Sequence, residues 1–301
     1  MTTVRDKLLN VAREIWALGN ESVQGWLEDR APRKGAALAF YTVFSLAPIL
    51  ILSITIAGFF FGEQAARGEI VGQIRGLIGQ DGAHAIQGLI ESAARPGSGL
   101  LPAVVGIVTL LLGATTALAE LKDGLDQIWR VPPERRAGFW YTVRKRLLSI
   151  GLILALGFLL LVSLIVSAAL AALSRIWGGD DLLAVALRAI NFLLSFALVT
   201  ALFATIYKVL PAVSIAWRDV IVGAVVTAVL FSVGKFLIGT YIGNSGITSA
   251  YGAAGSVILV LVWVYYSAQI FLLGAEFTRI YTYRLGSRSP RHRSGERSLQ
   301  A

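Results

Sequence analysis

Residues Phe236–Ala275 read FLIGTYIGNSGITSAYGAAGSVILVLVWVYYSAQIFLLGA, which is 40 consecutive residues without a charged side chain. A membrane-spanning helix needs about 20 apolar residues, because it crosses about 30 Å of hydrocarbon at about 1.5 Å per residue. Forty residues are too many for one crossing. The part from Gly239 to Gly252 is rich in turn-forming residues, so we divide the segment there into two predicted helices.

Four further segments upstream are long and apolar enough to cross a membrane. Together the six predicted spans are residues 36–61, 98–119, 147–172, 189–208, 219–241 and 253–275. None shows the alternating polarity of an outer-membrane barrel strand. Backbone polar groups need internal partners in hydrocarbon, so these spans should be helices. The expected fold class is all-α, a polytopic membrane protein with a bundle of six transmembrane helices and interfacial amphipathic helices.

The composition argues against a soluble enzyme. The 301 residues are 56% hydrophobic and 15% charged, whereas a soluble domain is about 25% charged. There is no cysteine and there are only two histidines, which excludes thiol chemistry and leaves too few ligands for an imidazole-based metal site. No nucleophile elbow, phosphate loop or zinc-protease motif is present. We therefore expect no enzymatic activity and no cofactor or metal.

The basic residues predict the orientation of the chain. Residues 1–34, 120–146 and 208–219 and the tail from Gly274 carry 6, 7, 2 and 6 Lys or Arg, 21 in all, whereas the loops on the other side carry five. Basic loops stay in the cytoplasm, so both termini should be cytoplasmic and the protein should lie in the bacterial inner membrane. The first 34 residues are polar, and we expect the first span to act as an uncleaved insertion signal.

The net charge of +9 has the same explanation. Basic residues at the cytoplasmic face favour anionic lipid headgroups. No soluble stretch interleaves basic and aromatic residues, so we expect membrane lipids and no nucleic acid as partners. A small-molecule, ion or lipid substrate is also expected.

Three segments lie outside the predicted spans. Residues 1–34 form a cytoplasmic N-terminal segment in which 4–27 have an amphipathic pattern, and this helix either lies on the membrane interface or packs under the bundle. Residues 63–95 resemble two short amphipathic helices broken at Gly79–Gly82. Residues 284–301 form a basic cytoplasmic tail that we expect to be disordered.

Polar residues inside a membrane span are costly and therefore suggest a function or a partner. In the second span one helical face carries Thr109, Gly113, Thr116, Glu120, Asp123 and Gln127. This face either lines a wet passage or forms a close seam between helices.

The last span has a second polar face, on which Tyr265, Gln269 and Glu276 lie close together around the helix axis. Glu276 either pairs with Arg279 or takes part in proton or cation handling. Lys235, in the outer half of the fifth span, either snorkels outward or pairs with an anionic group. In the first span Pro48 follows Ser45, and it predicts a kink or a broken helix that builds a binding site.

Several motifs in order resemble the YihY/BrkB family of bacterial inner-membrane proteins. They are Ala39-Phe-Tyr-Thr-Val-Phe-Ser-Leu-Ala-Pro48, Tyr207-Lys-Val-Leu-Pro211, Trp217-Arg-Asp219, Tyr251-Gly252, Leu261-Val-Trp-Val-Tyr-Tyr-Ser-Ala-Gln-Ile270 and Leu273-Gly-Ala-Glu276. The resemblance covers roughly residues 33–283 and implies six helices with both ends in the cytoplasm. That family has carried the label "ribonuclease BN-like" and has been linked to serum resistance, envelope lipid export and sodium-dependent transport. The motif residues expected to matter are Ser45, Pro48, Lys235, Tyr251, Gln269 and Glu276.

The leading hypothesis is a transporter or permease for a lipid-like or small charged solute, with a cavity lined by spans one, two, five and six. The candidate solute or ion pathway consists of Ser45, Pro48, Thr116, Glu120, Lys235, Tyr251, Gln269 and Glu276. The alternative is a non-transporting membrane scaffold for envelope assembly or serum resistance. A ribonuclease is disfavoured because no clustered carboxylates or histidines could cleave RNA.

Overall fold

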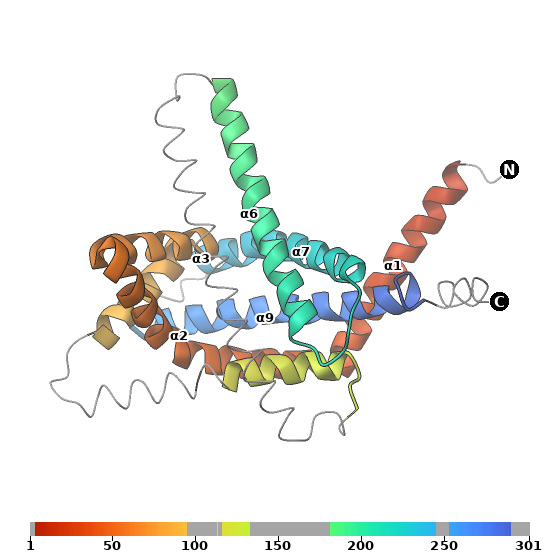
Figure 1. Ribbon diagram of the computed structural model, residues 1–301, viewed down its shortest axis with the longest axis horizontal. Helices are drawn as coiled ribbons and strands as arrows, with labels where there is room; N and C mark the ends of the chain where they lie inside the picture. The colour runs from red at the N-terminus through yellow and green to blue at the C-terminus, as the bar shows by residue number, and fades with distance from the viewer. Residues whose placement is uncertain (1–3, 95–112, 114–115, 133–180, 245–252, 290–301) are drawn as a thin grey trace. The chain divides into compact units, whose positions relative to one another are not determined.

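The computed structural model describes residues 4–94, 113, 116–132, 181–244 and 253–289. The regular structure in these ranges is entirely helical (Figure 1). The helices are α1 (Val4–Glu28), α2 (Ala31–Phe61), α3 (Glu63–Ala94), α6 (Asp181–Val209), α7 (Trp217–Asn244) and α9 (Ala253–Arg284). Residues 116–128 form a further helix. The third predicted span and most of the second lie outside the described residues.

Three of the described helices are long and apolar enough to cross a membrane. These segments are Ala189–Val209 in α6, Trp217–Tyr241 in α7 and Val257–Arg284 in α9. They correspond to the fourth, fifth and sixth predicted spans, and the last extends beyond the predicted end at residue 275. The expectation of an all-helical membrane fold is confirmed for the part of the chain that the structure describes.

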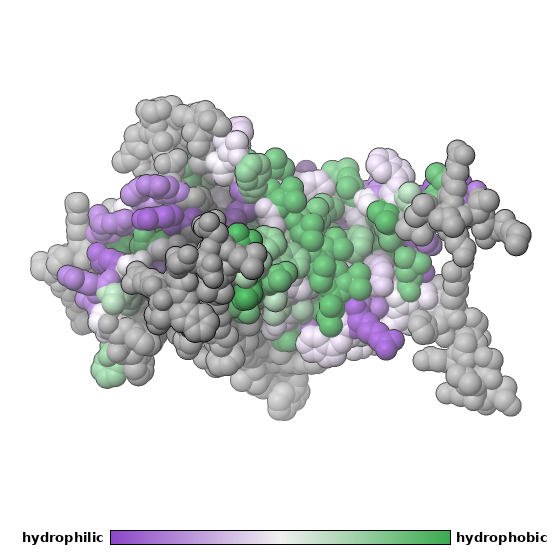
Figure 2. All heavy atoms as spheres, turned by 90° about the horizontal axis from the view of Figure 1, so that it is seen from above, coloured by the Kyte–Doolittle hydropathy of each residue, from purple (hydrophilic) through white to green (hydrophobic). Residues whose placement is uncertain are grey.

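The outer surfaces of α6 and α7 are apolar. Large hydrophobic side chains are exposed along both helices, among them Val185, Ile190, Phe192, Leu193, Ile221, Val233, Phe236 and Leu237. Figure 2 shows hydrophobic side chains gathered along the middle of the face that it views. A water-soluble monomer rarely exposes so much contiguous apolar surface, whereas a helix surrounded by lipid must do so.

Contacts divide the chain into two compact units, which we describe separately. The first unit comprises residues 1–29, 125–229 and 273–301, and the second comprises residues 30–124 and 230–272. Because α7 and α9 are long, each contributes residues to both units.

In the second unit α2 and α3 form a tight helical hairpin. A single residue, Gly62, separates the two helices, and its φ of 87° lies in the region that favours glycine. A side chain would also be crowded at Gly58, where a Cβ would lie 3.1 Å from the Glu63 Cα. α2 continues through Ser45 and Pro48 without interruption, so the proline does not end the helix. The core of the hairpin contains Ile54, Ile86 and Ile90, together with Val260 of α9.

The prediction of two short helices in residues 63–95 is wrong, because α3 is one helix of 32 residues. Gly79 and Gly82 do not break it. A glycine inside a helix costs only about 1 kcal/mol relative to alanine. The burial of Val71, Ile86 and Ile90 on one side of α3 outweighs that cost.

In the first unit α7 and α9 approach closely through two reciprocal glycine–threonine contacts. A Cβ on Gly223 of α7 would lie 1.9 Å from the Thr278 Oγ1 of α9. Conversely, a Cβ on Gly274 of α9 would lie 2.1 Å from the Thr227 Oγ1 of α7. On each helix the glycine lies four residues before the threonine, and the glycine of one helix faces the threonine of the other. The two helices therefore run antiparallel. We call these four residues the Gly–Thr seam.

The threonines of the seam meet their hydrogen-bonding needs within their own helices. The Thr227 hydroxyl is 2.7 Å from the Gly223 carbonyl oxygen, and the Thr278 hydroxyl is 2.7 Å from that of Gly274. The Tyr207 hydroxyl of α6 lies 3.1 Å from the Thr227 Oγ1. All three side chains are buried. Small residues that let helices meet, with polar groups satisfied locally, are typical of packing inside a membrane.

Two buried aspartates fix the connections at the ends of these helices. Asp126 accepts a hydrogen bond of 2.8 Å from the Ala212 amide, which lies in the connection between α6 and α7. Asp219, in the first turn of α7, accepts hydrogen bonds from the Ser287 amide at 3.1 Å and the Ser287 hydroxyl at 2.7 Å. The beginning of the C-terminal tail is therefore docked against α7. Residues 290–301 of the tail lie outside the described part.

A Gly223→Ala substitution should destabilise the protein, because the new methyl group overlaps Thr278. Overpacking of this kind costs about 1–3 kcal/mol. The matched control is Gly239→Ala, also on α7, where nothing lies within 4 Å of the added Cβ. Thermal unfolding in detergent should show a lower Tm for Gly223→Ala and an unchanged or higher Tm for Gly239→Ala. Equal Tm values would mean that α7 and α9 do not meet at the seam.

Candidate functional site

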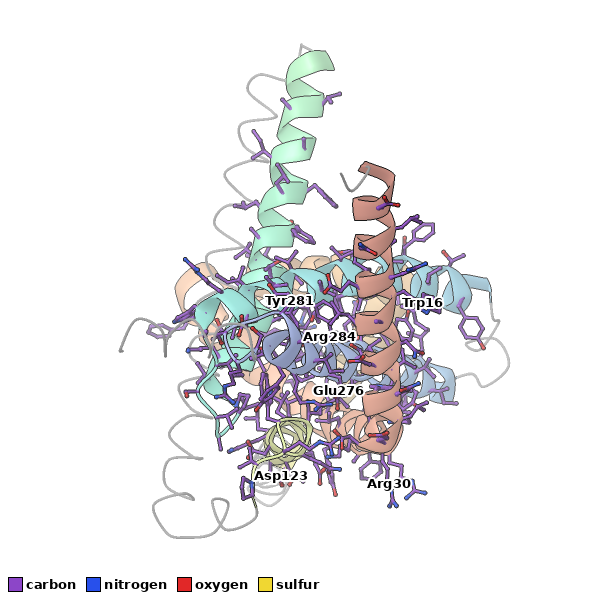
Figure 3. The ribbon with its side chains drawn as sticks, turned by 90° about the vertical axis from the view of Figure 1, so that its right-hand side faces the viewer. Trp16, Arg30, Asp123, Glu276, Tyr281 and Arg284 are labelled. Carbon is purple, nitrogen blue, oxygen red and sulfur yellow. The ribbon has the colours of Figure 1, made fainter. Side chains whose placement is uncertain are left out.

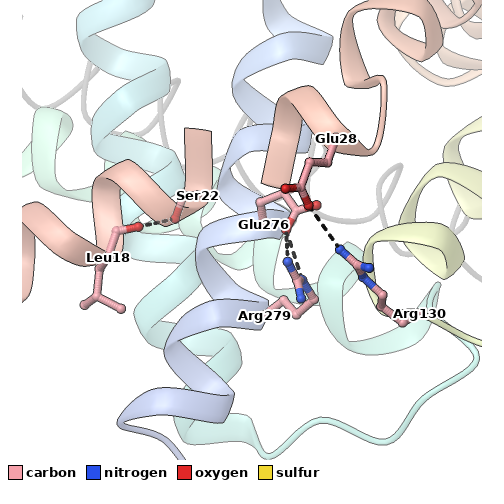
Figure 4. Close-up of polar contacts among 6 residues, drawn as sticks. All are labelled: Leu18, Ser22, Glu28, Arg130, Glu276 and Arg279. Atoms are coloured by element: carbon pink, nitrogen blue, oxygen red, sulfur yellow. Dashed lines mark hydrogen bonds and ion pairs between the residues drawn. The ribbon is translucent and has the colours of Figure 1, made fainter. Parts of the chain in front are cut away.

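The most unusual group in the first unit is the carboxyl of Glu276. This residue lies on α9 inside the apolar span and is 0% exposed. Its Oε2 is 2.8 Å from the Arg279 Nη2 and 3.0 Å from the Arg279 Nε, so it forms a two-point ion pair (Figure 4). The other oxygen, Oε1, is buried and receives no hydrogen bond. A buried charge is expensive even when it is paired, so its retention suggests a function.

A second buried carboxyl, that of Asp29, faces Glu276. Asp29 follows the last residue of α1 and is 7% exposed, and its amide donates to the Gly25 carbonyl at 2.9 Å. Arg30 then takes a left-handed conformation (φ 52°), which ends α1 at this point. The Asp29 Oδ2 also receives no hydrogen bond. Two carboxylates accept and do not donate, so these two groups can bond only through a shared proton or a bound cation.

Gly25 allows α1 to come this close to α9. A Cβ at this position would lie 2.9 Å from the Glu276 Oε2 and 3.2 Å from the Arg279 Nη2. The absence of a side chain at Gly25 thus permits the contact of Asp29 with Glu276. We refer to Gly25, Asp29, Glu276 and Arg279 as the carboxyl-pair site.

A surface groove begins at this site. It has a volume of about 630 Å³ and lies between α1 and the end of α9. The lining residues are Glu14, Glu21, Arg279, Ile280, Tyr283, Arg284 and Leu285. Because Arg279 both lines the groove and binds Glu276, the buried carboxyl is one side chain away from the surface.

Two exposed ion pairs surround the site. Arg284 pairs with Glu21, and the Arg130 Nη2 lies 3.7 Å from the Glu28 Oε2 (Figure 4). Exposed pairs contribute little stability, about 0–1 kcal/mol. They are therefore suited to being broken and remade without unfolding the unit.

The chemistry available at the carboxyl-pair site is binding of a proton or a monovalent cation. Within the described residues, no group of three or more Cys, His, Asp or Glu side chains is arranged to hold a metal ion. Two ionised carboxylates and one adjacent guanidinium together carry a net charge of −1, which one bound proton or monovalent cation would neutralise. Buried acidic residues of this kind are typical of proton relays in pumps and transporters.

The structure places the other predicted pathway residues elsewhere. Lys235 is exposed on α7, and Thr116 and Glu120 are half-buried in the helix of residues 116–128. Ser45 and Pro48 lie on α2, but their side chains, and all of Tyr251, are outside the described part. Of the described residues in this set, Ser45, Pro48, Thr116, Glu120, Lys235 and Gln269 belong to the second unit.

Gln269 forms a second polar feature, in the second unit. Both its Nε2 and its Oε1 are buried without a hydrogen-bond partner. The amide is pressed against α2 at Gly35, where a Cβ would lie 1.9 Å from the Nε2. An unsatisfied buried amide is rare and requires an explanation such as ligand binding.

The sequence patterns did not identify Asp29 and Gly25. The sequence predicted only an amphipathic pattern for residues 4–27, and the apolar side chain of Ile15 within it is 65% exposed. The face that packs consists instead of Leu18, Ser22, Gly25 and Asp29, all buried. Their spacing of four, three and four residues places them on one side of a helix, and this mixed pattern of small and polar residues was the available signal.

Comparison with known proteins identifies relatives of this chain. A family model described as virulence factor BrkB matches residues 22–298. A UPF0761 membrane protein of Stenotrophomonas maltophilia (strain K279a) is 27% identical over 91% of the chain and 61% of the relative. One from Pseudomonas aeruginosa (strain LESB58) is 29% identical over 83% of the chain and 59% of the relative. The chain thus spans about 60% of the length of these relatives. No solved structure matches.

Removal of Arg279 should be more damaging than removal of the whole ion pair. In Arg279→Met the Glu276 carboxyl loses its partner, and an uncompensated buried charge costs about 3–5 kcal/mol. The double variant Arg279→Met/Glu276→Gln has no charge to compensate and should recover most of this loss. Unfolding in mixed micelles measures the free energies of the wild type, of Arg279→Met, of Glu276→Gln and of the double variant. Additive effects of the two substitutions would show that the side chains do not interact.

Proposed function

The chain belongs to the virulence factor BrkB (YihY/BrkB) family. We propose that it is an inner-membrane transporter or permease driven by a proton or monovalent cation. The observation that carries this proposal is the carboxyl-pair site. Glu276 and Asp29 are buried at an apolar span, each with an oxygen atom that receives no hydrogen bond. A chain that needed only a stable fold would gain nothing from two facing carboxyls in this environment.

The proposed topology has six spans with both termini in the cytoplasm. Three described helices are long and apolar enough to be the fourth, fifth and sixth crossings, and α2 covers the range proposed for the first. The loops and tails predicted on the cytoplasmic side carry 21 basic residues and those on the other side carry five, which supports the orientation. In this topology α1 and the end of α9 lie at the cytoplasmic face, so the groove beside Arg279 opens to the cytoplasm.

The proposed coupling step is electrostatic. A proton or cation bound between Asp29 and Glu276 neutralises one of the two carboxylates, which weakens the attraction of Glu276 for Arg279. The positive charge of Arg279 is then available to bind a ligand in the groove that this residue lines. An anionic or zwitterionic solute, such as a lipid headgroup, is the kind of substrate that a released guanidinium would bind. Release of the coupling ion would restore the Glu276–Arg279 pair and displace the solute.

The second candidate function is a non-transporting scaffold for envelope assembly. The observation that favours it is the Glu276–Arg279 ion pair of α9, on which Gly25 of α1 packs, because this pair can serve only to hold Glu276 in place where α1 meets α9. A scaffold needs the pair intact and moves no ion.

The test is ion flux in proteoliposomes. Glu276→Gln and Asp29→Asn should reduce proton flux, measured with an internal pH dye, or sodium flux, measured with a sodium dye, to the level of empty vesicles. The shape of each side chain is kept, so the fold should survive. The matched control is Glu28→Gln, which removes a neighbouring carboxylate that is exposed and should leave the flux unchanged.

Two outcomes would contradict the proposal. Wild-type protein that moves neither ion down an imposed gradient would favour the scaffold. Wild-type flux in both Glu276→Gln and Asp29→Asn would show that a different site carries the ion.

A further inference from the structure

α1 has a second face that the carboxyl-pair site does not use. Leu9, Trp16, Val23 and Leu27 lie within about 40° of one another around the helix axis, at about 100° per residue. They are 47%, 77%, 44% and 57% exposed, respectively. We call these four residues the α1 stripe. It lies on the opposite side of α1 from Leu18, Ser22, Gly25 and Asp29, which are buried.

Contacts with α9 fix the direction of this stripe and its position along α9. Gly25 packs on Glu276, and Glu21 pairs with Arg284. Both α9 residues belong to the last turns of the apolar span Val257–Arg284. α1 therefore lies beside the end of a membrane span, and the stripe points away from the helix that anchors it. Figure 3 shows Trp16 on the side of α1 away from Glu276 and Arg284.

We propose that the α1 stripe inserts into the boundary between headgroups and acyl chains of the leaflet in which α9 ends. The position of the anchoring contacts, on residues of the apolar segment of α9, favours lipid as the occupant. The exposed apolar side chains of α6 and α7 in the same unit also require lipid around them. Tryptophan concentrates at this boundary because its ring is apolar and its N–H is polar. The proposal requires a membrane protein but does not depend on transport.

The charge of α1 gives this insertion a distinctive property. The helix carries three basic residues, Arg5, Lys7 and Arg13, and four acidic residues, Asp6, Glu14, Glu21 and Glu28. An amphipathic helix that binds by electrostatic attraction is rich in lysine and arginine. With a net charge of −1, α1 has no such attraction to anionic lipid. Insertion should therefore depend on the apolar stripe alone and not on the charge of the bilayer.

Insertion would also link the membrane to the carboxyl-pair site. The stripe residues Val23 and Leu27 are each two residues away from a member of that site, Gly25 and Asp29. α1 is rigid as a continuous helix of 25 residues. A change in the depth or tilt of the stripe would therefore move Gly25 and Asp29 against Glu276.

The chain contains no cysteine, so single spin labels can be introduced without background. The stripe positions are Leu9→Cys and Val23→Cys, and each has a matched control at the next residue, Asn10→Cys and Gln24→Cys, which is also exposed. Full-length protein is reconstituted into phosphatidylcholine vesicles and into vesicles that also contain phosphatidylglycerol. The readout is the accessibility of each label to oxygen, which partitions into lipid, and to a water-soluble nickel complex.

We expect the labels at residues 9 and 23 to show a several-fold higher oxygen-to-nickel ratio than those at residues 10 and 24, with the same result in both lipids. Equal ratios at the stripe and control positions would overturn the proposal, since the stripe would then face water. Spin–spin broadening confined to residues 9 and 23 would assign the stripe to a second copy of the chain instead. Oxygen accessibility that appears only with phosphatidylglycerol would contradict insertion through apolar contacts.

Discussion

A carboxylate inside an apolar span must be matched by other groups, and this constraint governs the first unit. Glu276 has a guanidinium on one oxygen atom, a second oxygen atom without a hydrogen-bond partner, and a second carboxyl, that of Asp29, beside it. The contact with Asp29 requires α1 to lie directly against α9, and Gly25 makes that possible because it has no side chain. The position of α1, the groove beside Arg279 and the direction of the α1 stripe all follow from this one buried charge.

The Gly–Thr seam holds α9 in place on the side opposite the buried Glu276 carboxylate. Gly274 and Thr278 lie on the opposite side of α9 from Glu276, since residues two positions away are rotated by about 200°. α9 is thus held between α7 on one side and α1 on the other. The α7 contact is tight and locally satisfied, with threonine hydroxyls bonded within their own helices. The α1 contact is polar and incompletely satisfied, because the Glu276 Oε1 and the Asp29 Oδ2 receive no hydrogen bond.

The sequence predicted those features that depend on composition along the chain. The long uncharged segments indicated the helices α6, α7 and α9, and Glu276 and Gln269 were identified because they interrupt apolar segments. The contact of Asp29 with Glu276 could not be predicted, because it joins residues 247 positions apart and Asp29 by itself resembles an ordinary helix-end acid. The continuity of α3 was also missed, since local glycines suggested a break that packing against α2 prevents. The contacts of Gly223 and Gly274 were not predicted either, because only the structure shows that each glycine faces a threonine.

The most direct test of this account is an experimental structure of the protein in a lipidic phase, at a resolution that shows the oxygen atoms of Asp29 and Glu276. We predict that the two carboxyls face one another beside Gly25, with hydrogen-bond contact or density for a bound ion between them, and that Arg279 contacts only the other oxygen of Glu276. A structure in which Asp29 turns to solvent, or in which α1 lies away from α9 at Gly25, would contradict the account.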